Sequence, residues 1–153
     1  MHCDLDAFYA AVETLHHNLN PEIPLILGSD PKNGTGRGIV STCNYAARKY
    51  GIRSAMPISE AWKRCPGPPY GNGHYLKSTR GLYSRASRMV MDILSDHADV
   101  FEQASIDEAY LDVTNSCEGD WDKALALAKS LQVKINDKLS LSTSFGIGPT
   151  RIL

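Results

Sequence analysis

The order of helix-like and strand-like apolar patterns constrains this fold more than any other feature of the sequence. Outside residues 20–75 the expected elements are strand 1–3, helix 7–17, helix 78–97, strands 100–105 and 109–113, helix 121–138 and strand 142–147. In the segment 78–97, apolar residues recur at the i, i+3, i+4, i+7 spacing of an amphipathic helix. This order predicts an α+β fold of the split β-α-β, or ferredoxin-like, kind, with helices on one face of a mixed or antiparallel sheet.

Residues 20–75 interrupt that order and are predicted to form a small inserted α/β subdomain. Its expected elements are strands 25–27 and 39–42 and helices 44–50 and 59–64, followed by a Pro- and Gly-rich linker at 66–73. We therefore divide the chain into an N-terminal segment (residues 1–19), an insertion (residues 20–75) and a C-terminal segment (residues 76–153).

Charge is divided unevenly along the chain, although the net charge is only −1. Residues 37–88 hold ten Lys or Arg and a single acid, Glu60, whereas residues 92–122 hold ten Asp or Glu and no Lys or Arg. A basic segment followed by an acidic one suits a site that holds polyphosphate on one wall and divalent cations on the other. The alternative, two ordinary solvated faces, is equally compatible with the charges alone.

Other features of the composition exclude several classes of protein. No stretch approaches the roughly 18 apolar residues of a membrane-spanning helix and no signal peptide is recognisable, so we expect a cytoplasmic protein (nuclear in a eukaryote) without a membrane partner. The four cysteines lack any C-x-x-C pair, so neither a zinc site nor a disulfide framework is indicated. We expect four buried, reduced thiols.

Acidic residues fall where expected strands of one sheet end or turn. Asp4 follows the first strand, and Asp107 and Glu108 occupy the tight turn between strands 100–105 and 109–113. Three carboxylates brought together repel one another, and hard divalent ions with oxygen ligands relieve that cost. Two such ions can stabilise the attacking and leaving oxygens of a phosphoryl displacement. The alternative is that these acids are ordinary cap and turn residues.

Three segments together resemble a known family. They are residues 3–13 (CDLDAFYAAVE), 42–57 (TCNYAARKYGIRSAMP) and 105–112 (SIDEAYLD). In this order and spacing they resemble the catalytic and fingers motifs of Y-family translesion DNA polymerases, close to the branch of polymerase IV (DinB) and polymerase kappa. The resemblance implies the palm and inserted fingers of a template-directed DNA polymerase that performs low-fidelity translesion synthesis in DNA repair and damage tolerance.

The resemblance also implies roles for the acidic residues. Asp4, Asp107, Glu108 and the backbone carbonyl of Leu5 match the ligands of two Mg²⁺ ions, for which Mn²⁺ is an accepted substitute. Glu108 would ligate the metal next to the primer 3′-hydroxyl and favour deprotonation of that hydroxyl. Asp6 matches a motif acid with a structural role, and the helical pattern alone makes it a candidate N-cap.

Further positions match residues that contact the incoming nucleotide. Tyr9 matches the steric gate that excludes a ribose 2′-hydroxyl, although an aromatic on a buried helix face is the explanation without the motif. The backbone amides of Ala7 and Phe8, at a helix start, match positions that bind triphosphate oxygens. The side chains expected to contact the β- and γ-phosphates are Thr42, Tyr45 and Arg48, and those expected against the nascent base pair are Ser41 and Ala55.

The same resemblance implies the partners. They are primer–template DNA, a dNTP, and a sliding clamp bound through a C-terminal region beyond this chain; we expect a monomer. In the family the palm begins a few residues before Met1 and continues past Leu153 into thumb and little-finger domains, so we expect this chain alone to be poorly active. Two alternatives stay open: another palm-type nucleotidyl transferase or cyclase, and a non-catalytic polymerase-like scaffold.

Overall fold

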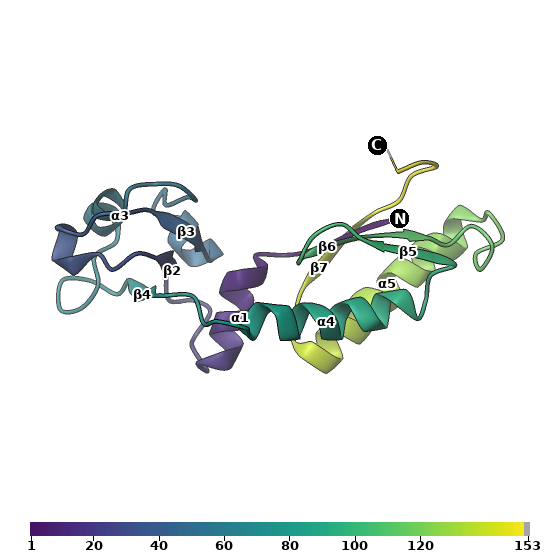
Figure 1. Cartoon of the computed structure of the whole chain (residues 1–153), viewed down its shortest axis with the longest axis horizontal. Coiled ribbons are helices and arrows are strands. Elements are labelled where there is room, and N and C mark those ends of the chain that lie inside the picture. The colour runs from purple at the N-terminus through teal and green to yellow at the C-terminus, as the bar shows by residue number, and fades with distance from the viewer. Residues whose placement is uncertain (152–153) are drawn as a thin grey trace. The chain divides into compact units, whose positions relative to one another are not determined.

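Strand β1 (His2–Leu5) lies inside a four-stranded antiparallel sheet in the computed structural model of the chain, which describes residues 1–151. The strand order is β5–β6–β1–β7, with β5 at Val100–Gln103, β6 at Glu108–Asp112 and β7 at Thr143–Gly146. Helices α4 (Leu82–Ser95) and α5 (Trp121–Leu139) lie on one face of this sheet (Figure 1). This is a ferredoxin-like arrangement, so the α+β prediction is confirmed.

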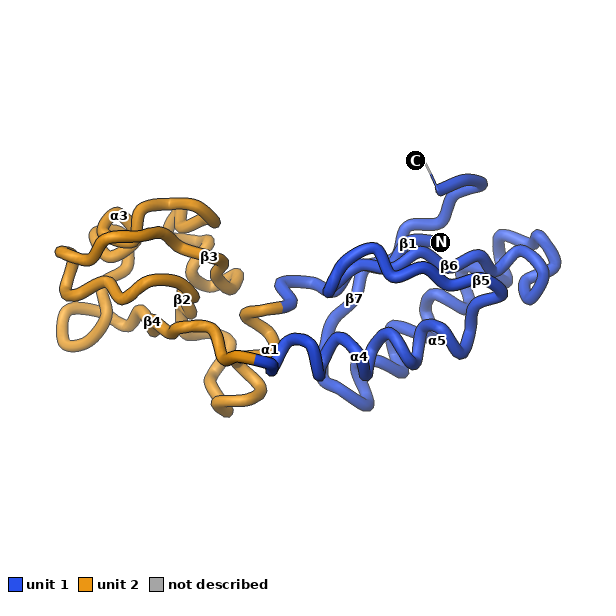
Figure 2. The backbone as a smooth tube through the Cα atoms, viewed as in Figure 1, with its two compact units in different colours: residues 1–8, 81–153 blue, residues 9–80 orange. Residues whose placement is uncertain are grey.

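The described chain divides into two compact units, which Figure 2 colours separately. Unit 1 contains residues 1–8 and 81–153, of which 152 and 153 lie outside the described residues, and unit 2 contains residues 9–80. The division into 1–19, 20–75 and 76–153, drawn from the order of the expected helices and strands, stays a prediction about functional domains.

The two helices of unit 1 each bury one face. The buried residues are Ala124, Ala128, Leu131 and Ile135 on α5, and Ser87, Val90, Met91 and Leu94 on α4. Asp120 begins α5, because its carboxylate accepts hydrogen bonds from the backbone amides of Asp122 and Lys123 at 2.8 and 3.2 Å. α4 begins at Leu82, whereas the sequence pattern predicted that it begins at residue 78. Gly81, in the left-handed region with φ 76°, stands immediately before Leu82 and is incompatible with a continuous helix.

Unit 2 is built on a three-stranded mixed sheet. The strand order is β3–β2–β4, with β2 at Leu25–Gly28, β3 at Val40–Cys43 and β4 at His74–Leu76. β3 runs antiparallel to β2, whereas β4 runs parallel to it. The helices are α1 (Phe8–His16, whose first residue belongs to unit 1), α2 (Tyr45–Arg48) and α3 (Ile58–Arg64), with a 3-10 turn η1 at Lys32–Gly34. β4 does not match any expected strand, because its three residues are half-buried and show no alternation.

The loop expected to be a linker, residues 66–73, lies within unit 2. The amide of Gly73 donates a hydrogen bond to the carbonyl of Pro66 at 3.0 Å, so the loop closes on itself. Beside it, the ring of Trp62 packs on the ring of Tyr75, with centroids 5.4 Å apart. The loop therefore leads the chain from α3 directly into β4.

We expect the hydroxyl of Tyr75 to make the protein less stable at alkaline pH. It donates a hydrogen bond of 2.7 Å to the carbonyl of Cys65, and burial, with a smaller contribution from the Cys65 thiol, raises the pKa of this phenol above its ordinary value. Above about pH 10 the unfolded chain releases the phenolic proton and the folded chain keeps it, so the free energy of unfolding falls. Urea unfolding between about pH 8 and pH 11 should show a smaller fall in Tyr75→Phe than in the wild type. Equal falls would contradict this prediction.

All four cysteines are free and buried, which confirms the expectation of reduced thiols. Within residues 1–151, no helix combines the length and the apolar character needed to cross a bilayer.

Candidate active site

The structure brings the three predicted acids together at one edge of the sheet in unit 1, where β1 ends and β6 begins. In the antiparallel pair of β1 and β6, Asp4 is directly opposite Glu108. The amide of Leu5 donates a hydrogen bond of 2.9 Å to the carbonyl of Asp107, which fixes the turn before β6 beside the end of β1. Residues directly opposite one another in such a pair project to the same face, so Asp4 and Glu108 share a face.

Electrostatic crowding is visible at Asp4. Burial raises the pKa of its carboxyl group, and the charges of Asp107 and Glu108 raise it further. The nearby His2 lowers the pKa of the same carboxyl group. The folded chain therefore holds mutually repelling carboxylates, an arrangement that a divalent cation would stabilise.

Two residues outside the predicted set hold these carboxylates. His2 lies two positions before Asp4 on the same face of β1, and its Nε2 is 3.3 Å from Oε1 of Glu108. The hydroxyl of Ser105 donates to Oδ1 of Asp107 at 2.8 Å and lies 3.3 Å from Oε2 of Glu108. The sequence contained no signal for the His2 contact, whereas Ser105 belongs to the segment 105–112, which resembles a catalytic motif of the family.

Helix α4 supports the turn that carries Asp107. The buried hydroxyl of Ser87 donates a hydrogen bond to the carbonyl of Ile106. The side-chain amide of Gln103 donates to the carbonyl of Ser105 at 2.9 Å and lies 3.4 Å from the Ser87 hydroxyl. These contacts connect the acidic turn to the core of unit 1, and sequence reasoning missed both Ser87 and Gln103.

Asp6 ties β1 to β7. Its carboxylate accepts hydrogen bonds from the hydroxyls of Ser142 and Ser144 at 2.7 and 2.6 Å. The expectation that Asp6 is an N-cap is wrong, because α1 begins at Phe8 and Ala7 stands between. These contacts agree with a structural role for Asp6.

The donor chemistry of this edge fits a hard divalent cation. The carboxylates of Asp4 and Glu108 come from the paired strands β1 and β6, and that of Asp107 comes from the turn before β6. Oxygen is the ligand type that Mg²⁺ prefers. Cys3 does not extend the set, because burial and the charges of Asp4 and Asp6 raise the pKa of its thiol to about 12. Among the described residues, no three His, Cys, Asp or Glu side chains meet at metal-site spacing. The metal ligands, including the Leu5 carbonyl, therefore stay a prediction.

The turn from β1 into α1 carries the amides predicted to bind triphosphate. Ala7 has φ 43°, in the left-handed region that residues with a Cβ rarely adopt. Phe8 is buried, and its ring centroid lies 6.4 Å from that of Tyr83. Strain of this kind persists only where surrounding packing enforces it, and it gathers at ligand sites.

Tyr9 follows on α1, as the first residue of unit 2. Its half-buried ring packs against a cluster of Ala10, Leu25 and Leu27. The aromatic core role that the helical pattern alone suggested is thus partly correct. The steric-gate role stays a prediction.

Three predicted phosphate contacts lie close together in unit 2. Thr42 is on β3, opposite Leu27 of β2, and Tyr45 and Arg48 are exposed on α2. The guanidinium of Arg48 lies over the ring of Tyr45, 4.9 Å from its centroid. Arg48 therefore presents a fixed cation on the same short helix as the Tyr45 hydroxyl.

The two small residues predicted to face the base pair are also brought together. The amide of Ala55 donates to the carbonyl of Val40 at 2.9 Å, which places it beside Ser41. Both are exposed, and Ala55 has φ 67°. Their role against a base pair stays a prediction.

Asn44 is a residue that sequence reasoning read only as a helix start. Its side-chain oxygen accepts from the amides of Leu25 and Ala47 at 3.0 and 2.9 Å. Its side-chain nitrogen donates to the carbonyl of Ile23 at 2.8 Å. Asn44 is buried, so it joins the start of β2 to the start of α2 from inside unit 2.

Comparison with known families gives a match over almost the whole chain. The model of the impB/mucB/samB family matches residues 3–153. The DNA polymerase IV of Methanoculleus marisnigri is 43% identical over 149 residues, which are 97% of this chain and 39% of that protein. The DNA polymerase IV of Streptococcus agalactiae is 43% identical over 153 residues, which are 100% of this chain and 40% of that protein. The chain thus spans about two fifths of these relatives.

Solved structures of DNA polymerases also match almost the whole chain. A structure described as an insertion ternary complex of Dbh DNA polymerase has a TM-score of 0.88 and 35% identity, covering 99% of this chain and 43% of that one. A crystal structure of DinB from Sulfolobus solfataricus has a TM-score of 0.86 and 34% identity, covering 99% of this chain and 42% of that one.

Proposed function

This chain belongs to the impB/mucB/samB family of Y-family DNA polymerases, and we propose that it supplies the palm and inserted fingers of a template-directed DNA polymerase. The reaction is attack of a primer 3′-hydroxyl on the α-phosphorus of a dNTP, with loss of the hydroxyl proton and release of pyrophosphate. The biological context is low-fidelity translesion synthesis. The pairing of Asp4 with Glu108 beside Asp107, in a chain that matches this family, carries the proposal.

The acidic edge of unit 1 is the proposed place of the chemistry. Asp4, Asp107, Glu108 and the Leu5 carbonyl would hold two Mg²⁺ or Mn²⁺ ions. When bound, such ions lower the pKa of the attacking hydroxyl and neutralise charge on the phosphates. Glu108 would orient the primer hydroxyl and favour loss of its proton, and the contact with His2 keeps this carboxylate at the sheet edge.

The proposed nucleotide contacts divide by chemistry. The amides of Ala7 and Phe8 would donate hydrogen bonds to triphosphate oxygens. The side chains that would bind the β- and γ-phosphates are Thr42, Tyr45 and Arg48, with Arg48 as the cation. Ser41 and Ala55 would leave room beside the nascent base pair because their side chains are small.

Single-nucleotide insertion tests the proposal. The full-length protein, with primer–template DNA and Mg²⁺, should add the dNTP that complements the template base and should add little of the others. Insertion that ignores the template base would favour a different palm-type transferase or cyclase. A folded protein that binds DNA and inserts nothing would favour a scaffold.

Tyr9→Ala should open the active site to ribonucleotides. Removal of the ring takes away the proposed clash with a ribose 2′-hydroxyl, so the efficiency of insertion of the matching rNTP should rise about a hundredfold relative to that of the dNTP. Comparison of kcat/KM for one dNTP and its rNTP measures this change. Tyr9→Phe keeps the ring and should keep the selectivity, and loss of selectivity in that variant would contradict a purely steric gate.

The proposed partners are primer–template DNA, a dNTP and, for the whole protein, a sliding clamp. Work on chromosomal DNA would place the protein in the cytoplasm, or in the nucleus of a eukaryote. We propose that it acts as a monomer.

A further inference from the structure

Helix α1 carries a fully buried carboxylate, which the proposed reaction does not use. Glu13 is 0% exposed and lies in unit 2. Burial of a carboxylate is unfavourable unless hydrogen bonds replace its water. A residue retained in this state has a structural or positional role that its partners identify.

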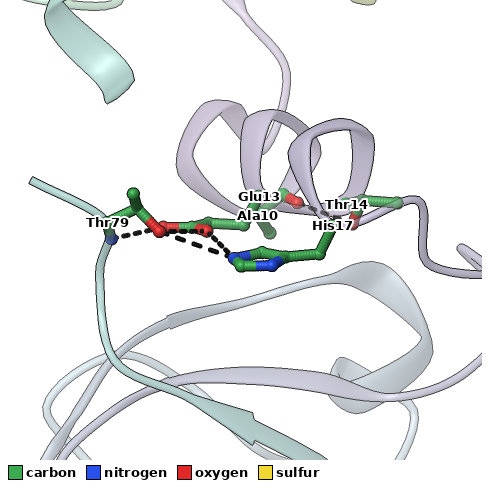
Figure 3. Close-up of polar contacts among 5 residues, drawn as sticks. All are labelled: Ala10, Glu13, Thr14, His17 and Thr79. Carbon is green, nitrogen blue, oxygen red and sulfur yellow. Dashed lines mark hydrogen bonds and ion pairs between the residues drawn. The ribbon is translucent and has the colours of Figure 1, made fainter. Parts of the chain in front are cut away.

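Glu13 is hydrogen-bonded to Thr79, which lies on the segment that leaves unit 2. Its Oε1 accepts a hydrogen bond of 2.6 Å from the amide of Thr79, and its Oε2 accepts one of 2.9 Å from the Thr79 hydroxyl (Figure 3). His17, four residues further and immediately after the end of α1, has its Nε2 3.0 Å from Oε2. Figure 3 shows Glu13 and His17 projecting from the same side of α1 toward Thr79.

Thr79 has a special place in the chain. Unit 2 joins unit 1 at two points, between residues 8 and 9 and between residues 80 and 81. Glu13 lies shortly after the first and Thr79 shortly before the second. The two hydrogen bonds between Glu13 and Thr79 therefore join the segment that enters unit 2 to the segment that leaves it, across 66 residues of sequence.

The same helix face carries Tyr9. Residues four apart on a helix lie on the same side, so Tyr9 and Glu13 are one turn apart on one face of α1. Tyr9 and Leu76 both pack against the cluster of Ala10, Leu25 and Leu27, and Leu76 ends β4, three residues before Thr79. The segment 76–79 thus holds this face of α1 near the Tyr9 ring through packing and near Glu13 through hydrogen bonds.

The helix needs such an anchor. α1 has nine residues, a length at which an isolated helix is unstable in water. It also follows Ala7, whose φ of 43° lies in the left-handed region that residues with a Cβ rarely adopt. A small rotation of α1 would move the Tyr9 ring, and steric discrimination against one hydroxyl depends on shifts of this small size.

We propose that Glu13 is a positioning residue for sugar selection, which acts by fixing α1, and with it the ring of Tyr9, to the segment at Thr79. This inference rests on the proposed function and adds to it a residue that sets specificity without touching the nucleotide. The carboxylate form matters, because both oxygens accept hydrogen bonds from Thr79.

Glu13→Gln in the full-length protein tests the inference. The amide has nearly the same shape but no charge: its oxygen can accept from the Thr79 amide, whereas its nitrogen can only donate to the Thr79 hydroxyl, so both charge-assisted hydrogen bonds are lost. The ratio of kcat/KM for a dNTP to that for the matching rNTP should fall about tenfold, the factor equivalent to one hydrogen bond to a charged group. A purely structural role would lower both efficiencies together and leave the ratio unchanged. An unchanged ratio in folded Glu13→Gln overturns the inference.

A double-mutant cycle tests whether Glu13 acts through the ring. In a Tyr9→Ala background, Glu13→Gln should cause no further loss of selectivity, because the group that it positions is absent. Additive losses overturn the inference. Wild-type protein without dNTP insertion, or Tyr9→Ala with unchanged selectivity, would instead overturn the proposed function, and the inference with it.

Matched variants complete the test. Thr79→Val keeps the backbone amide and removes the hydroxyl, so it should lower the ratio about threefold, and Thr79→Ser should restore it. These variants decide the outcome if Glu13→Gln does not fold: unchanged selectivity in Thr79→Val then overturns the inference. Glu60→Gln is the control, because this exposed acid of α3 pairs with Arg64 at 3.3 Å and should leave the ratio unchanged.

Discussion

Replacing Asp107 with Asn should lower the rate of nucleotide insertion about a thousandfold while the protein stays folded. The loss follows from removal of a negative oxygen from the proposed metal ligands. Stability should not suffer, because Ser105 can still donate its hydrogen bond to Oδ1 of the new amide and because the repulsion on Asp4 becomes smaller. Single-turnover insertion with saturating Mg²⁺ measures the rate, and urea unfolding without Mg²⁺ measures the stability.

The combination of the two results identifies a functional carboxylate. Without a divalent cation, the free energy of unfolding of Asp107→Asn should equal that of the wild type or exceed it by less than about 1 kcal/mol. Added Mg²⁺ should raise the melting temperature of the wild type more than that of the variant, because a ligand stabilises the state that binds it. Asp112→Asn is the control: Asp112 is exposed at the far end of β6, where its carboxylate accepts from Thr114 at 2.6 Å. Equal insertion rates in Asp107→Asn and wild type would exclude the two-metal interpretation.

The layout of unit 1 was predictable because its signals are long and repetitive. Apolar spacing over many residues indicated α4 and α5, and the turn at Asp107 and Glu108 separated two expected strands. Once the strand order was inferred, a shared edge for Asp4 and Glu108 followed from sheet geometry. The roles of these acids came from the motifs, because cap and turn residues give the same local pattern.

The polar contacts that hold the site could not be predicted, because they join residues distant in sequence. Ser87 bonds the carbonyl of Ile106, 19 residues away, and Glu13 bonds Thr79, 66 residues away. In the sequence, Glu13 is a charged residue on a short helix, for which solvent exposure is the usual expectation. Its complete burial depends on the segment around Thr79, which lies against α1 and is distant from it in sequence.

Unit 2 shows the same limit for regular structure. β4 has three residues, too few for a periodic signal, and its existence depends on the parallel pairing of Leu25 with His74. The sequence therefore predicted a linker at 66–73 and no strand after it, although β4 at His74–Leu76 completes the sheet. Short strands of this kind are specified by their partners rather than by their own residues.

Asn44→Ala should destabilise the protein by about 3 kcal/mol or more, the largest stability loss that we expect from a single polar side chain in unit 2. The substitution would leave the buried amides of Leu25 and Ala47 without the oxygen that accepts their hydrogen bonds, and each such group costs about 1–3 kcal/mol. Urea unfolding measures this loss, and Asn20→Ala is the control. The exposed side chain of Asn20 accepts one hydrogen bond, from the amide of Glu22 at 2.9 Å, so its removal should cost about 1 kcal/mol or less.

The effect of Asn44→Ala should extend to nucleotide binding. Asn44 lies between Thr42 on β3 and Tyr45 on α2, and its oxygen accepts from the amide of Ala47 within that helix. Loss of this cap frees the short helix that presents Arg48, so KM for the dNTP should rise in the fraction that stays folded, whereas kcat, set in the other unit, should change less. A stability loss no greater than that of Asn20→Ala would show that Asn44 does not join β2 to α2 as its hydrogen bonds indicate.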